Sequence, residues 1–480
     1  MLNQLKRLGG DSLLYAFMNV GTKIIAFFML PIYTSYLGTE RYGLLGVMDN
    51  YTSLLTFMVI FGTDAALAYY YFNTKDANRR LLYVRNVMNL RLAIIVLSFA
   101  AVFVLSPVLP NLLFKTDLYN SSQLMFFIYI NLIILLLDTV GTLILTVLRY
   151  EYKTIKVVVF TVLKMALIAA LSYVILRFFM KDIEGALFAR IISGALIILF
   201  LLRQAASYFR FQFDREVMRD MLRYGAPLVP ASLSFWVIIS SNSVILQFIQ
   251  SPVEVGLYQA AIRFAALISL VTSGIQMAWR PYSMSMKDKP NAKEMFSKVY
   301  IIILVLGAFG ILGVATVMPF VIKMLNAEFH TAYQYVPLLS AATFLNFYYL
   351  IISVGIFILK KTKYITYAFV AGAIIDVVLN LVLVPFYSIW GSVAAYLLSY
   401  MAAIVYIFYK SQKIYYVPVS FMKLSILFLG SVAGSIYMVY SQLNQLPWWH
   451  IAIVWLVFLV LLGITRVDKD LLRKNTVQSN

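Results

Sequence analysis

The chain has no cysteine and only two histidines among its 480 residues. The absence of cysteine excludes disulfide bonds and metal sites built from thiolates. The two histidines, His330 and His450, fall in predicted loops or at helix ends, and a zinc centre could not be built from them alone. We therefore expect no metal ion and no cofactor.

Charged residues are also scarce. They make up 12% of the chain, whereas hydrophobic residues make up 62% and aromatic residues 16%. Soluble domains are about one quarter charged and about half apolar. The composition therefore indicates an integral membrane protein. The apolar runs are long and lack the alternating polarity of membrane β-barrel strands, so the predicted fold class is all-α.

A helix needs about 20 apolar residues to cross a bilayer. Segments of this kind predict about fourteen transmembrane helices, at approximately residues 11–36, 43–72, 86–109, 122–148, 155–179, 184–202, 223–249, 256–279, 297–320, 333–359, 364–386, 390–409, 419–441 and 447–465.

Acidic residues are outnumbered: 39 lysines and arginines stand against 20 carboxylates, which gives a net charge of +19. About 29 of the cations fall in alternate loops, and only about five fall in the loops of the opposite set. By the positive-inside rule both termini are cytoplasmic in a multi-pass protein of the cell membrane. The basic balance therefore reports topology and does not indicate a nucleic-acid partner, although membrane lipids are expected partners.

The chain also repeats itself. Residues 36–69 shifted by 213 positions align with residues 249–282, so that Gly43 meets Gly256. A second register, with an offset of 206, aligns Ile183, Gly185, Ala189 and Ser193 with Ile389, Gly391, Ala395 and Ser399. Such repeats are typical of transporters that alternate access around a site near the midplane, and six helices in each half give both repeats the same orientation. The pattern indicates a transport protein.

The repeat sets the predicted domains: an N-terminal six-helix lobe at 1–202, a cytoplasmic linker at 203–222, a C-terminal six-helix lobe at 223–412, and helices 13 and 14 with a cytoplasmic tail at 413–480. The sequences GTERYG and SPVEVG are expected to be loops that follow the first helix of each lobe. Pro31, Pro227 and Pro230 lie in or near these two helices, either as bends or as marks of helix ends.

Five cations fall inside predicted spans: Lys23, Arg91, Lys164, Arg190 and Arg263. A cation that faces lipid at the centre of a span costs about 2.5–3.5 kcal/mol, so these side chains must face water or a partner. Asp49, Asp138 and Asp376 lie at comparable depth, and Asp64 lies nearer a helix end. The first lobe is therefore predicted to enclose a positive cavity that binds an anion. The alternative is that the charges form buried ion pairs.

Polar residues at helical spacing extend this predicted cavity. Asn19 shares a face with Lys23, Asp49 begins a polar face on the second span, and Gln259 shares a face with Arg263. The predicted charge and polar partners of the cations are Asn19, Asp49, Asp138, Gln259 and Asp376. Polar faces of this kind also hold helices together without binding a ligand.

Three motifs carry a family resemblance: LPIYTSYLGTERYGLLGVMDNY at 30–51, EVGLYQAAIRFAALISLVTSGIQMAWRPY at 254–282 and DVVLNLVLVPFYSIWGSVAAYLLSY at 376–400. They are similar to the polysaccharide transporter branch, the Wzx-type oligosaccharide-lipid flippases, of the multidrug/oligosaccharidyl-lipid/polysaccharide exporter superfamily. The resemblance implies two lobes around a V-shaped cavity, with Lys23 and Arg263 near a cationic centre for a lipid diphosphate. Asn242 stands where relatives often have a charged pair, which argues against ion coupling at that position.

The resemblance implies a flippase, and not an enzyme, that translocates undecaprenyl-diphosphate-linked oligosaccharide by alternating access for cell-surface polysaccharide biosynthesis. Its expected partners are this lipid-linked oligosaccharide, membrane lipids and, as further candidates, polysaccharide assembly proteins. The alternatives are another exporter of the superfamily, for lipid II or for drugs and cations, and a membrane polysaccharide polymerase. A polymerase needs acid and base groups at an aqueous face, and Asp182 and Glu184 are the closest pair in the predicted external loops.

Overall fold

The computed structural model describes residues 2–466, and these residues form helices and no strands. The predicted all-α fold class is confirmed. The chain divides into two compact units between Gly256 and Leu257. This division by contacts does not test the predicted domain boundaries, which follow the repeat, and the part of the predicted tail after Arg466 lies outside the described residues.

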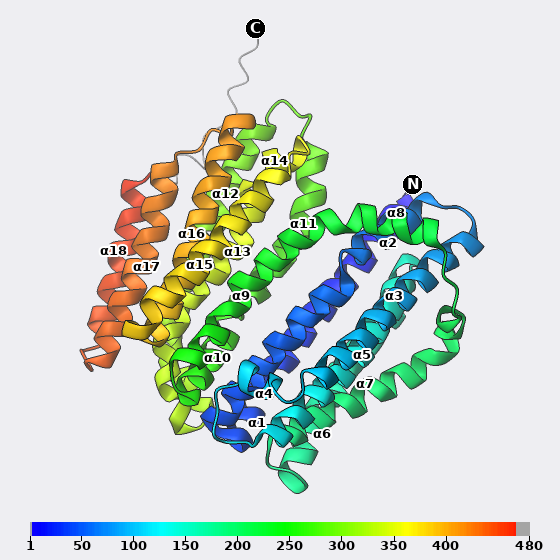
Figure 1. The fold of residues 1–480 in the computed structure, drawn as a ribbon. Coiled ribbons are helices and arrows are strands. Elements are labelled where there is room, and N and C mark those ends of the chain that lie inside the picture. The colour runs from blue at the N-terminus through cyan, green and yellow to red at the C-terminus, as the bar shows by residue number, and fades with distance from the viewer. Residues whose placement is uncertain (1, 467–480) are drawn as a thin grey trace. The chain divides into compact units, whose positions relative to one another are not determined.

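The first unit holds the helices α1 to α9, with α10 crossing its end (Figure 1). Their bounds are α1 Leu2–Ile60, α2 Thr63–Asn73, α3 Ala77–Val104, α4 Leu109–Leu113, α5 Ser121–Tyr150, α6 Thr154–Phe178, α7 Ile183–Ala205, η1 Ala206–Phe209, α8 Arg215–Gly225, η2 Ala226–Leu228, α9 Val229–Ile249 and α10 Pro252–Ala265.

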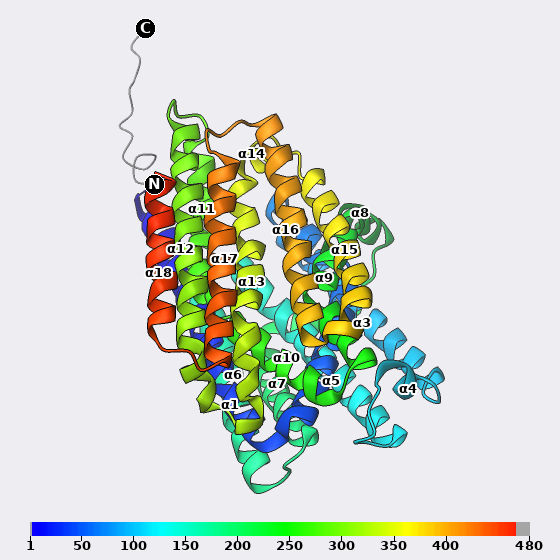
Figure 2. The same ribbon diagram turned by 90° about the vertical axis from the view of Figure 1, so that its left-hand side faces the viewer.

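The second unit holds the remaining helices: α11 Ile268–Met286, α12 Ala292–Val321, η3 Ile322–Met324, η4 Ala327–Tyr335, α13 Val336–Ile352, α14 Val354–Ile358, α15 Lys363–Tyr387, α16 Ile389–Ile414, α17 Phe421–Leu443 and α18 Trp449–Ile464. The helices α12, α17 and α18 lie side by side in both views (Figures 1 and 2). Leu312, Met438 and Phe458 form part of their shared core.

Twelve segments of the described chain are long and apolar enough to cross a membrane, and a shorter apolar helix follows at Trp449–Ile464. The first segment, Phe17–Asn73, is 57 residues long and contains the first two predicted spans. At about 1.5 Å per residue this length is far more than one crossing of a bilayer requires. The protein is therefore a multi-pass membrane protein. The order of its apolar helices follows the order of the predicted spans.

Three predicted boundaries are wrong. The expected loop SPVEVG is helical from its second residue, because α10 begins at Pro252. The expected loop GTERYG is helical within α1, and only Gly38 leaves the helical conformation, with φ 68° and ψ 177°. Glycine tolerates this backbone conformation because it has no Cβ atom. The bend in α1 is thus at Gly38 and not at Pro31. The predicted span 256–279 is also interrupted, since α10 ends at Ala265 and α11 begins at Ile268.

Local sequence explains several helix starts. Asn120 and Gln123 form a capping box at the start of α5, and Asp214 accepts hydrogen bonds from the backbone amides of Glu216 and Val217 at the start of α8. Pro227 lies in η2 and Pro230 in the first turn of α9. A missing amide is harmless in a first turn, so these two prolines mark a helix start.

Glycines at repeat-related positions make close backbone approaches. A Cβ atom at Gly43 would lie 2.7 Å from the backbone nitrogen of Gly256 and 2.8 Å from the carbonyl oxygen of Pro252. A Cβ atom at Gly256 would collide in turn with the carbonyl of Thr39, which aligns with Pro252 at the same offset of 213. The contact is therefore reciprocal, as two elements related by a two-fold axis require.

The second repeat register is visible in two helix starts. Helix α7 begins at Ile183 and α16 begins at Ile389, which is the predicted offset of 206. Each has a buried glycine two residues later, against the backbone of the preceding turn: Gly185 against Met180, and Gly391 against Leu383. A side chain at either glycine would push the neighbouring helices apart, so both units use the same tight connection.

Candidate functional site: the ion pairs of the first unit

Three of the predicted cations bind carboxylates within the first unit. Arg190 of α7 binds Asp49 of α1 through both carboxylate oxygens, with Nη2 3.2 Å from Oδ2. The side chains retain 18% and 25% of their exposure. A two-point contact between a guanidinium and a carboxylate fixes the relative orientation of the two groups and also pairs their charges. This pair joins residues that lie 141 positions apart in the chain.

Lys164 of α6 binds Asp138 of α5, with Nζ 2.6 Å from Oδ1. This pair is more open, since Asp138 keeps 46% of its side-chain exposure and Lys164 keeps 23%. On the same helix α5, Asn131 accepts a hydrogen bond from Thr52 of α1 at 3.2 Å. Asn131 and Asp138 are two helical turns apart and so lie on one face of α5.

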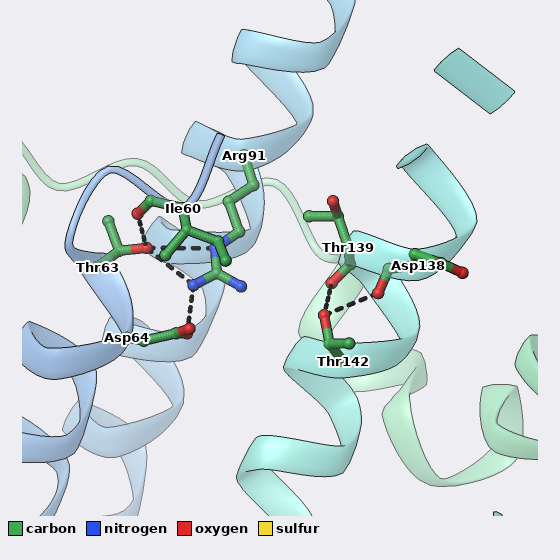
Figure 3. A network of polar contacts seen from close by, with 7 residues as sticks. All are labelled: Ile60, Thr63, Asp64, Arg91, Asp138, Thr139 and Thr142. Atoms are coloured by element: carbon green, nitrogen blue, oxygen red, sulfur yellow. Dashed lines mark hydrogen bonds and ion pairs between the residues drawn. The ribbon is translucent and has the colours of Figure 1, made fainter. Parts of the chain in front are cut away.

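Arg91 of α3 fastens the break between α1 and α2. Figure 3 shows its guanidinium turned toward Thr63 and Asp64. The distances are 2.9 Å from Nη2 to the Thr63 hydroxyl and 2.5 Å to Asp64 Oδ1. The Thr63 hydroxyl also donates to the carbonyl of Ile60. Arg91 is only 1% exposed, whereas Asp64 is half exposed. Such full burial favours a structural role for this arginine.

The backbone at this break is also unusual. Phe61 and Gly62 both have positive φ, at 42° and 71°. A Cβ atom at Gly62 would collide with the carbonyl of Gly225, which ends α8. The hydrogen bonds that link Arg91, Thr63, Asp64 and the carbonyl of Ile60 therefore hold a strained turn. At this turn the chain contacts the end of α8. The sequence analysis did not predict this connection, because it treated residues 43–72 as one continuous helix. The structure has a turn at residues 61–62, directly before Asp64.

The remaining predicted residues are divided between the two units. Lys23 and Asn19 are partly buried on α1, and both make interactions. In the second unit Arg263 of α10 is exposed, and Gln259 is buried with its side-chain nitrogen unpaired among the described residues. The structure therefore brings Asp49 to Arg190 and Asp138 to Lys164. Whether the five cations form one cavity stays a prediction.

Asp376 belongs to a different environment in the second unit. It is fully buried on α15, and its Oδ1 accepts a hydrogen bond from Ser399 of α16 at 3.3 Å. One turn along, Asn380 accepts from Ser392 at 2.9 Å and donates to the carbonyl of Asp376. Ser399 thus bonds the carboxylate itself, whereas Asn380 and Ser392 form a hydrogen-bonded pair that contacts the backbone carbonyl of Asp376.

Asp182, the acid considered for an enzyme, has structural contacts. Its carboxylate accepts a hydrogen bond from the backbone of Ile183 at the start of α7, binds the Tyr119 hydroxyl and lies 3.6 Å from Arg41. Burial, with the Asp182 carboxylate as a second cause, raises the pKa of Tyr119. Asp182 is thus held as a helix cap among other side chains.

The comparisons with known proteins agree with this architecture. A model of the family described as polysaccharide biosynthesis protein matches residues 8–287. This match spans more than half of the chain. The chain belongs to the polysaccharide biosynthesis protein family. The match includes the motifs at 30–51 and 254–282 and confirms the resemblance of the chain to the polysaccharide transporter branch. A search among curated proteins finds no sequence match.

Solved structures of transporters share the fold. The lipid II flippase MurJ in an inward closed conformation has a TM-score of 0.73 at 14% identity, over 95% of this chain and 99% of that one. An inward-facing multidrug resistance transporter of the MATE family, in the MOP superfamily, has a TM-score of 0.60 at 15% identity, over 83% and 93%. At these identities the likeness shows the fold alone. Family and fold together indicate a membrane transporter or flippase.

Proposed function

We propose that this protein is a flippase that moves an undecaprenyl-diphosphate-linked oligosaccharide from the cytoplasmic to the outer leaflet, for cell-surface polysaccharide biosynthesis. The observation that carries the proposal is the family match over residues 8–287, in a chain whose fold is that of a lipid flippase. The cargo of that flippase, lipid II, is also a lipid-linked saccharide. Both termini are proposed to be cytoplasmic, as the distribution of cations predicts.

The cations of the first unit are suited to a diphosphate, but in this conformation they are neutralised. Arg190 binds Asp49 and Lys164 binds Asp138. A phosphate group, like a carboxylate, can accept two parallel hydrogen bonds from one guanidinium. We therefore place the cargo's diphosphate in competition with these carboxylates: when cargo binds, Arg190 and Lys164 exchange partners. Lys23 and Arg263 complete the proposed binding set, with Asn19 and Gln259 as polar neighbours.

The polyprenyl tail requires an apolar surface. In the second unit an apolar cavity of about 80 Å³ opens among α12, α13, α16 and α17, and its lining includes Leu304, Phe408, Phe421 and Phe428. Burial of apolar surface drives the binding of a hydrocarbon chain without a directional contact. We therefore place the polyprenyl tail beside α17.

A drug or cation antiporter of the same superfamily is the second candidate. The described spans carry carboxylates that a cationic drug could approach, above all Asp138, which is 46% exposed. A polymerase is less well supported, because Asp182 is engaged as a helix cap. The antiporter and the flippase differ in the charge of the cargo, so one transport experiment separates them.

The test uses proteoliposomes that contain undecaprenyl-diphosphate oligosaccharide with a fluorescent sugar, and it follows loss of fluorescence to an external reductant. Lys23→Ala and Arg263→Ala are expected to abolish translocation while the protein remains inserted. Lys75→Ala, which removes an exposed loop cation, is the matched control. Normal translocation in both variants would remove these cations from the site, and transport of a cationic dye without the glycolipid would favour the antiporter.

A further inference from the structure

The segment between α7 and α8 must run along the membrane surface. It follows the candidate span Ile183–Leu202 and precedes the candidate span Arg215–Ile249. It reads ASYFRFQFD over residues 206–214, with three phenylalanines at alternate positions. A connection this short must stay close to the lipid head groups, because both of its ends are joined to helices that cross the bilayer.

The three phenylalanines are exposed. Phe209 retains 37% of its accessible surface, Phe211 retains 82% and Phe213 retains 57%. Tyr208, directly before them, is buried and anchors the segment in the first unit. Single exposed apolar residues need no explanation, but three within five residues form a patch, and such patches mark contact with a membrane or another protein. Aromatic side chains are favoured at the boundary between lipid and water.

Helix α3 holds the segment in place. Arg85 donates from Nε to the carbonyl of Ser207 at 2.8 Å and from Nη1 to the side chain of Gln212 at 2.7 Å. Asn89 donates to the carbonyl of Gln212 at 3.2 Å, and Asn86 accepts from the backbone of Asp214 at 2.9 Å. The phenylalanine patch is therefore built on a fixed backbone and does not arise from a loose loop.

The surroundings of the patch are basic. Residues 203–223 contain five arginines and three carboxylates. Four of these arginines, at positions 210, 215, 219 and 223, are exposed. One of the three carboxylates, Asp214, is occupied as the cap of α8. The buried face of α8 includes Val217, Met218 and Met221 and packs within the first unit. The charged face of α8 therefore points outward. Exposed aromatic groups beside exposed arginines match an anionic lipid surface in both chemistry and charge.

We propose that residues 209–219 form an anchor for anionic phospholipid, which places the phenylalanines among the acyl-chain ends nearest the head groups and the arginines among the phosphates. The anchor lies on the side that the cation distribution predicts to be cytoplasmic. The anchor continues into α8, whose last residue, Gly225, contacts Gly62 beside the Arg91 cluster. Lipid bound at the anchor would therefore affect the position of the break between α1 and α2. This inference does not depend on the cargo.

The absence of native cysteine allows a direct test. Ser207→Cys places one thiol at an exposed position two residues before Phe209, and a bimane fluorophore is attached there. Asn78→Cys, at the exposed start of α3 and outside the patch, is the matched control. The full-length protein is reconstituted in nanodiscs that contain phosphatidylglycerol or phosphatidylcholine, each with a nitroxide near the ester end of one acyl chain, at equal mole fraction.

The phosphatidylglycerol nitroxide is expected to quench the label at position 207 at least about twofold more than the phosphatidylcholine nitroxide does. The label at position 78 should show no such preference. Exchange of Arg210, Arg215 and Arg219 for glutamine should abolish the preference, and exchange of the three phenylalanines for serine should lower quenching by both lipids to the control level. Equal quenching of the position 207 label by both lipids would overturn the assignment to anionic lipid. Quenching at the control level would overturn the anchor itself.

Discussion

The two units treat buried polar groups in different ways. In the first unit, cations on α3, α6 and α7 bind carboxylates on other helices. In the second unit, the buried Asp376 accepts from Ser399, and the neighbouring Asn380 accepts from Ser392, all within the hairpin of α15 and α16. The two units share repeat glycines and helix starts, so this difference in side chains is superimposed on a common backbone plan.

The difference indicates separate roles. An ion pair can exchange its partner for another charged group, because each member keeps its charge when the pair opens. The Asp376 carboxylate instead accepts from the hydroxyl of Ser399, a neutral partner with no charge to exchange. The first unit is therefore the better candidate for a site that changes during transport, and the second unit for a fixed frame. The predictions below test this contrast in order of expected size.

The largest effect is expected at Asp64. Asp64→Ala leaves the Arg91 guanidinium, which is 1% exposed, without its carboxylate, and should lower stability by about 3–5 kcal/mol. Arg91→Met should cost less, because Asp64 is half exposed and can be hydrated. Thermal unfolding of both variants in detergent measures the order. If the two variants melt at the same temperature, the burial of Arg91 does not govern this cluster.

Asp49 and Arg190 separate structure from transport. We expect Asp49→Asn and Arg190→Gln each to destabilise the protein, and a double-mutant cycle to give a coupling of about 1–3 kcal/mol. The double variant has no unpaired charge and should regain stability. Because it also lacks the cation proposed for the diphosphate, it should not regain translocation of the labelled glycolipid. A double variant that transports normally would make this pair a structural link only.

A matched pair of serines tests the frame of the second unit. The Ser399 hydroxyl lies 3.3 Å from Asp376 Oδ1 as well as 2.9 Å from the carbonyl of Tyr396 in its own helix. Ser193, its counterpart at offset 206, donates to the carbonyl of Ala189 in its own helix. Ser399→Ala should therefore cost about 1–1.5 kcal/mol. Ser193→Ala should cost less than about 0.5 kcal/mol, because that carbonyl keeps its helical partner. Equal melting temperatures for the two variants would show that Ser399 does not support Asp376.

The sequence was sufficient for the coarse architecture. Apolar lengths predicted the spans, and the offset of 206 predicted that α7 and α16 start at equivalent residues. Gly43 and Gly256, aligned by sequence alone, make a reciprocal backbone contact. Such features follow from period, length and residue size, which a sequence displays directly.

The breaks and the ion pairs were harder to predict. Hydropathy does not report backbone angles, so the turn at Gly62 and the gap between α10 and α11 passed as continuous apolar sequence. The five cations could be identified by their cost in lipid, but their partners could not, because pairing depends on which helices pack together. Asp49 and Arg190 are 141 residues apart, and only the contact of α1 with α7 brings them together.

Only a small change in stability is expected when the Lys164–Asp138 ion pair is broken. Asp138 is 46% exposed, so the pair is partly hydrated, and Lys164→Gln should cost only about 0.2–1 kcal/mol. If Lys164 exchanges Asp138 for the cargo's diphosphate, the same variant should nonetheless lose most of its translocation. Asp138→Asn serves as the control, because it frees Lys164 from its competitor and should keep or raise binding of the labelled glycolipid. Weaker binding in Asp138→Asn than in Lys164→Gln would mean that the carboxylate contacts the cargo and that partner exchange does not occur at this pair.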